Sequence, residues 1–272
     1  MSNEHRNNAI NTLTSLWETL GTSYMPPFMT PNVLLGVGHV RALSGVRIDA
    51  PGEKDKEVLE SAAQVLEQDS FYCQQEEGTL QASGQSYINL NLYSIPKLKE
   101  LHSTHLMPVP KLEDDSKAGV EAYLKNLATV AEDSSTERHP EDPSNAVGAD
   151  WLAGLLFGYP EPAVASMPAF WAYGYQTNQA FRRRVRESDI AHASMYWEVS
   201  DGECVYDIPW FLAEHPQIIE HQSEWSRYLD DFYSSDWHQQ IAQEDDFQAT
   251  LTRAQERTGN LSGAGAEGGR DE

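Results

Sequence analysis

Residues 147–187 read VGADWLAGLLFGYPEPAVASMPAFWAYGYQTNQAFRRRVRE and form the richest apolar and aromatic stretch of the chain. Apolar side chains at helical spacing predict a first helix over 145–157. The side chains on this face are Trp151, Leu155 and Leu156. Gly158 can adopt a positive φ where that helix ends, and Pro160 cannot extend it. The chain is therefore expected to make a tight corner here and to start a second helix beyond it.

The second helix is predicted over 168–187, and one of its faces combines aromatic with polar side chains. Trp171, Tyr175, Asn178, Phe181 and Val185 share an arc of about 120°. Arg182 lies inside this arc and Arg186 at its edge. A guanidinium group can hold a carboxylate or phosphate through two hydrogen bonds. The face therefore predicts an anion-binding site formed by Trp171, Tyr175, Asn178, Arg182 and Arg186. In the alternative interpretation, Arg182 and Arg186 pair with the chain's own carboxylates and Asn178 satisfies buried backbone.

A histidine on an apolar stripe is the one candidate for catalysis. His221 falls in a predicted helix over 216–233, one turn before Trp225 and three residues before Glu224. An imidazole titrates near neutral pH and can act as a general base. No partner nucleophile is evident in the sequence, so a hydrogen-bonded core histidine is the alternative.

Alternation with a period of two predicts two small antiparallel sheets or hairpins, at about 71–93 and 194–208. Within the first, strands are expected at 71–75, 79–83 and 86–94. Within the second, Asp201-Gly202 is typical of a hairpin turn. Amphipathic helices are expected at 5–20, 52–67, 95–106 (with Ser94 as its cap), 115–132 and from about 236. The fold class is thus predicted to be α+β and mostly helical, with the helices packed around the central pair 145–157 and 168–187.

The polar segment 132–145 contains two prolines and no periodicity, which favours a linker. We therefore expect an N-terminal α+β lobe over 1–133, a linker over 134–145, and a mainly helical C-terminal lobe with a β-hairpin over 146–257. Residues 258–272 are rich in glycine and polar residues, and this composition is typical of a disordered tail.

Charge is the strongest global signal. The chain has 42 acidic and 19 basic residues and a formal net charge of −23. Such a surface repels the phosphates of nucleic acids and of anionic membranes, so direct binding to either is not expected. The acidic residues are spread over nearly every segment, which favours adaptation to a high-salt cytoplasm, where charges are screened. The alternative is an acidic surface that meets a basic partner or imitates nucleic acid.

The sequence carries few signals of location or cofactor. No apolar run reaches the roughly 20 residues that span a bilayer, and no secretory signal is evident at the N-terminus, so a cytoplasmic protein is expected. Two cysteines are too few for a disulfide framework. No Walker loop, His-Glu-x-x-His, Cys-x-x-Cys, Gly-x-Ser-x-Gly or dinucleotide motif is present. His102 and His105 are neighbours on a helix face, but the sequence locates no third ligand, so neither a metal nor a cofactor is predicted.

These observations leave three hypotheses, and they do not decide whether the chain is an enzyme. The first is an acidic interaction or regulatory protein that presents an aromatic surface around Trp171, Tyr173 and Tyr175 to a protein partner. The second is a small-molecule-binding protein or enzyme with an anion-binding pocket around Arg182 and His221. The third is a protein that imitates nucleic acid. The sequence does not indicate the oligomeric state.

Overall fold

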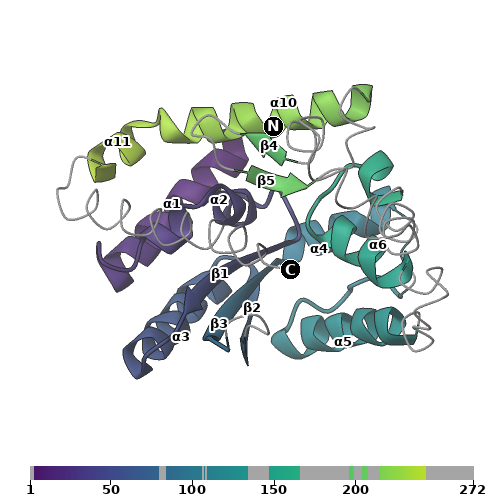
Figure 1. Cartoon of the computed structure of the whole chain (residues 1–272), viewed down its shortest axis with the longest axis horizontal. Helices are drawn as coiled ribbons and strands as arrows, with labels where there is room; N and C mark the ends of the chain where they lie inside the picture. Colours follow the sequence, from purple (N-terminus) through teal and green to yellow (C-terminus); the bar gives the residue numbers. More distant parts are fainter. Residues whose placement is uncertain are drawn as a thin grey trace, which may run out of the picture.

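The computed structural model describes residues 3–79, 84–105, 107, 109–133, 147–165, 196–198, 204–207 and 215–242. These residues form an α+β structure in which helices surround a small three-stranded antiparallel sheet (Figure 1). The predicted fold class is confirmed to this extent. The predicted helix over 168–187, with Trp171, Tyr175, Asn178, Arg182 and Arg186, lies outside the described residues. The packing of a central helix pair therefore stays a prediction.

The sheet is built from β1 (Leu43–Asp49), β2 (Phe71–Thr79) and β3 (Ser86–Ser94), in the order β1-β3-β2. The alternation in β3 directs Ile88, Leu90 and Leu92 into the core, and each is at most 1% exposed. The separate strand predicted at 79–83 is wrong at its first residue, because Thr79 ends β2; residues 80–83 lie outside the described residues. The other edge of the sheet is β1, which was not predicted as a strand, with Ile48 opposite Ile88.

Two helices, α1 (Asn3–Leu20) and α3 (Glu53–Gln68), contribute to the main core with the apolar face of the sheet. Leu13 and Leu16 from α1, and Leu59 and Leu66 from α3, are fully buried there. A short 3-10 helix η1 (Pro26–Met29) and α2 (Pro31–Val37) complete this layer. Burial of these large apolar side chains supplies the main stabilisation of the layer.

A second core cluster lies beside α4 (Ile95–Thr104), which begins directly after β3. The Ser94 side chain caps α4 by accepting a hydrogen bond from the backbone N–H of Lys97 (3.3 Å), as the sequence predicted. The other helices of this cluster are α5 (Lys117–Asp133) and α6 (Val147–Leu156). Helix α6 confirms the first helix expected in the aromatic stretch.

Helices α10 (Pro216–Tyr233) and α11 (Asp236–Ala242) follow one another along the upper edge of the view in Figure 1. The apolar face of α10 joins the main core through Ile218, Trp225, Tyr228, Leu229 and Phe232. Helix α10 therefore shares a core with α1 and α3, although more than 140 residues separate it from both in sequence. The boundary at 134–145 lies outside the described residues, and the division into lobes stays a prediction.

A short hairpin pairs β4 (Tyr196–Glu198) with β5 (Cys204–Asp207) in antiparallel fashion, with Glu198 opposite Cys204. It confirms the hairpin predicted around Asp201-Gly202. Within the described residues, no helix is long and apolar enough to cross a membrane.

Candidate ligand-binding site

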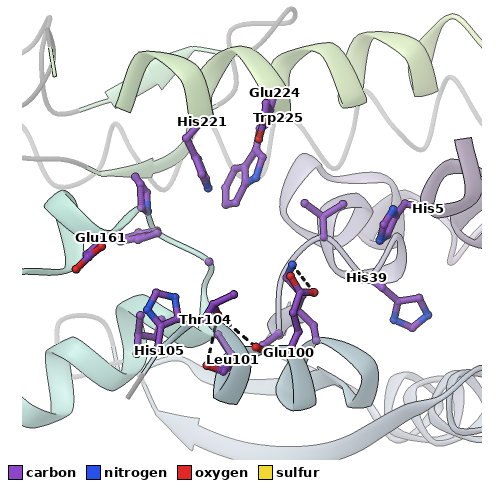
Figure 2. Close-up of a pocket in the computed structure, with 17 residues that line it drawn as sticks. His5, His39, Glu100, Leu101, Thr104, His105, Glu161, His221, Glu224 and Trp225 are labelled. Carbon is purple, nitrogen blue, oxygen red and sulfur yellow. Dashed lines mark hydrogen bonds and ion pairs between the residues drawn. The ribbon is translucent and has the colours of Figure 1, made fainter. Parts of the chain in front are cut away.

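A cavity of about 350 Å³ lies where α10, α4, the bend after α6 and the loop after α2 meet. Figure 2 shows its side chains approaching from several directions. Small-molecule sites are concave, mostly apolar and roughly 300–1,000 Å³ in volume. This cavity is at the small end of that range, and Leu101, Leu155 and Ala42 are among its apolar lining residues.

Helix α10 contributes His221 and Trp225, which both point into the cavity (Figure 2). They are one helical turn apart, so both lie on the same face of α10. Their ring centroids are 4.4 Å apart, and the Trp225 side chain is only 4% exposed. The guanidinium carbon of Arg41 lies 5.6 Å from the Trp225 ring centroid, within the range of a cation–π contact. These contacts fix the orientation of the indole.

The pKa of His221 is lowered to about 4, mainly by burial; a hydrogen bond with the Gly158 backbone opposes this shift, and the charge of Lys97 adds to it. The imidazole is therefore neutral near pH 7. A neutral imidazole has one N–H donor and one acceptor nitrogen, and the bond to a backbone carbonyl fixes which nitrogen carries the proton.

The bend after α6 is formed by Gly158, whose φ is +73°. Gly158 N–H donates to the carbonyl of Leu155 (3.0 Å), and Tyr159 N–H donates to that of Gly154 (2.9 Å). This pair of bonds is a Schellman motif, in which glycine is preferred because a side chain is strained at positive φ. A Cβ at Gly158 would also lie 3.1 Å from Cβ of Arg41 and 3.3 Å from Cζ2 of Trp225. The sequence predicted this corner, and the structure adds that it packs directly against the site.

Helix α4 contributes an ion pair to the cavity. Nζ of Lys97 lies 2.8 Å from Oε2 of Glu100, one turn along the helix, and both residues line the cavity. Thr104 and His105 line the same side at the end of the helix. Since both charged side chains are partly exposed, the pair adds little stability, and its relevance lies in the charge it places at the cavity.

His39 lines the cavity from the loop after α2, with a left-handed backbone (φ +54°). Its ring stacks on Phe71 with centroids 4.5 Å apart, and Nδ1 lies 2.8 Å from Oγ of Ser94. The Ser94 hydroxyl is fully buried and already accepts from the backbone of Lys97, so its own hydrogen is best placed toward Nδ1. We therefore assign the remaining proton of the neutral ring to Nε2.

The pKa of His39 is lowered to about 4, mainly by burial; the neighbouring His5 adds to this shift, and the charge of Asp69 opposes it. His39 is therefore neutral near pH 7, like His221. A non-glycine residue with positive φ is uncommon, and such strained residues cluster at functional sites. His39 thus combines a positive φ, a hydrogen bond to the serine that caps α4, stacking on Phe71 and a position on the cavity lining.

Of the residues predicted for a site, His221 lines this cavity, whereas Trp171, Tyr175, Asn178, Arg182 and Arg186 lie outside the described residues. His105 lines the cavity, but His102 hydrogen-bonds through Nε2 to Oη of Tyr123 (2.9 Å). Among the described residues, no group of three or more His, Cys, Asp or Glu side chains could hold a metal ion.

Three cavity residues, His39, Lys97 and Glu100, were not predicted as part of this site. His39 follows Gly36-x-Gly38, which lacks the third glycine of a dinucleotide motif and indicates no role for the histidine. Lys97 and Glu100 lie in a helix that was predicted together with its cap, but nothing local indicates which face of that helix meets α10. The signal that could have identified them is the i,i+3 spacing of opposite charges directly after a capping serine.

The chain matches no family model, no curated protein and no solved structure. No function can be transferred to it by similarity, and only the chemistry of its own residues bears on its role.

Proposed function

We propose that this protein binds a small organic molecule in the cavity beneath α10. The observation that carries the proposal is that His221, Trp225, His39 and the Lys97–Glu100 pair, from elements far apart in the sequence, line one cavity together with apolar side chains. A volume of about 350 Å³ corresponds to roughly a dozen water molecules at about 30 Å³ each. The ligand is accordingly small, with on the order of ten non-hydrogen atoms.

Recognition fits these residues better than proton transfer does. A general base works best when its pKa lies near the working pH, whereas burial lowers the pKa of His221 to about 4. At neutral pH this imidazole is a weak base, but it can orient a polar group by hydrogen bonding. We therefore assign His221 to binding, and its role as a general base stays an untested prediction.

The first function predicted from the sequence was an interaction or regulatory protein with an aromatic surface around Trp171 and Tyr175. Those residues lie outside the described ranges, so this function, a protein partner, the cytoplasmic location and adaptation to high salt stay predictions. The anion-binding pocket around Arg182 is equally untested.

A blocking substitution tests the proposal. Thr104 is exposed at the end of α4 and lines the cavity, so Thr104→Trp would obstruct it. Thr129 is a matched control, because it is also exposed on a helix, and each hydroxyl donates to the carbonyl four residues earlier. A library of small polar and aromatic molecules is screened by saturation-transfer NMR against the wild type and both variants.

We expect one or more library members to bind the wild type and the Thr129→Trp variant but not the Thr104→Trp variant. If every molecule that binds does so equally well to all three proteins, or if none binds at millimolar concentration, the cavity is not a ligand site.

A further inference from the structure

The charges on the cavity lining do not balance. Among the described residues that line it, Lys97 is the one lysine and no arginine is present, although the guanidinium of Arg41 contacts the Trp225 ring. Three glutamates, Glu100, Glu161 and Glu224, are part of the same lining. Lys97 is paired with Glu100 at 2.8 Å, and the negative charge of Glu100 therefore offsets the positive charge of Lys97. Glu161 and Glu224 are exposed, and neither forms an ion pair with another described residue. Two carboxylates with no ion-pair partner among the described residues therefore lie on the cavity lining.

The buried histidines do not reverse this balance. Burial is the main cause that lowers the pKa of His39 and of His221 to about 4, so neither carries charge near pH 7. The formal charge of the whole chain, −23 with histidines counted as neutral, has the same sign as the cavity. A field of this sign raises the local concentration of cations and repels anions.

The floor of the cavity has a different character from its rim. Leu101, Leu155 and Trp225 are buried, and they offer apolar and aromatic surface to the body of a ligand. Glu161 and Glu224 are exposed, so they offer their charge where the cavity opens to solvent. A molecule that fits both parts has an apolar or aromatic body and a positively charged end.

We infer that the ligand is a small organic amine, bound with its apolar body against Trp225 and its ammonium group toward Glu161 and Glu224. This inference rests on the proposed ligand site and goes beyond it by naming the charge and the chemical class. The inferred ligand is a cation, whereas the ligand predicted around Arg182 was an anion. The difference arises because the described lining holds more carboxylates than lysine and arginine side chains.

Three probes of matched shape separate the charge types: benzylamine, benzyl alcohol and benzoate. Each has about eight or nine non-hydrogen atoms, close to the size that the cavity admits. Their dissociation constants are measured by NMR titration at pH 7 and low salt, where exposed charges are least screened. The variants are Glu161→Gln and Glu224→Gln, which keep side-chain size and remove the charge. Glu60→Gln is the control, because Glu60 is an exposed residue of α3 and does not line the cavity.

We expect benzylamine to bind more tightly than benzyl alcohol, and benzoate to bind most weakly. Glu161→Gln and Glu224→Gln should each weaken benzylamine about threefold, the scale of an exposed ion pair, and should leave benzyl alcohol unchanged. Glu60→Gln should change the dissociation constant of neither benzylamine nor benzyl alcohol. Raising the salt concentration should reduce the preference for the amine.

The outcomes distinguish this inference from the function on which it rests. If benzoate binds as tightly as benzylamine, or if Glu60→Gln weakens benzylamine as much as the two lining variants do, the amine inference is overturned. The inference also fails if none of the three probes binds while other molecules are excluded by Thr104→Trp, and in that case the ligand site itself stands. If no molecule distinguishes Thr104→Trp from Thr129→Trp, both proposals fall.

Discussion

Replacing Gly158 by alanine tests how closely the bend after α6 is packed against the site. Gly158 has a φ of +73°, and an added Cβ would lie 3.1 Å from Cβ of Arg41 and 3.3 Å from Cζ2 of Trp225. A side chain in the left-handed region costs about 1–2 kcal/mol. Both neighbours are buried, so they can move little, and overpacking adds roughly 1 kcal/mol or more. Gly158→Ala should therefore lower the free energy of unfolding by about 2–3 kcal/mol.

Gly21 provides the matched control. It also follows a helix with positive φ (+70°), but a Cβ there would have no neighbour within 4 Å. Gly21→Ala should lower the free energy of unfolding only by the cost of a side chain at positive φ, about 1–2 kcal/mol. The assay is urea-induced unfolding followed by circular dichroism, with the slope of the transition compared between variants. If the two substitutions cost the same, Arg41 and Trp225 do not pack against the bend, and the described geometry of the site is wrong.

Three further predictions concern stability and reactivity. Ser94→Ala removes the cap of α4 and the partner of His39, and should cost about 1–2 kcal/mol in thermal or urea unfolding; an unchanged midpoint would contradict the cap. His221 has a folded pKa of about 4 against 6.5 when unfolded, so the unfolded state binds more protons between these values and stability falls as the pH falls. Between pH 7 and pH 4, the wild type should therefore lose about 1–2 kcal/mol more of its free energy of unfolding than His221→Asn loses, a value that allows for the ring's partial exposure. Parallel pH profiles of the two proteins would refute this. Burial raises the pKa of the Cys73 thiol to about 12, so in a Cys204→Ser background it should not react with a thiol reagent at pH 8 until the protein is unfolded. Stoichiometric reaction in native buffer would show that Cys73 is accessible.

Features with a local signal could be predicted from the sequence. An apolar helix followed by Gly158 and Pro160, a serine before a helix, and Asp201-Gly202 between alternating segments each depend on a few consecutive residues, and the structure contains the expected α6 corner, α4 cap and β4–β5 hairpin. No helix or strand was predicted over 32–45, and this stretch has no clear period because it joins the end of α2 to the start of β1. Short apolar runs of this kind do not distinguish helix from strand.

The site could not be assembled in the same way. His39 and His221 are 182 positions apart, and they line one cavity because α10 packs into the core that α1 and α3 share with the sheet. Nothing within a window of 15 residues encodes this packing. The sequence could place His221 on the buried stripe of α10, but it could not identify the residues that would face it.

The most direct test of the account is a protein-observed NMR titration that follows the indole N–H of Trp225, assigned by comparison with a Trp225→Phe variant. With benzylamine as the probe, the Trp225 signal should shift and saturate, while that of Trp17 on α1, which does not line the cavity, should stay in place. If the Trp225 signal does not move while the probe binds elsewhere, or if both indoles shift together, the cavity beneath α10 is not the ligand site.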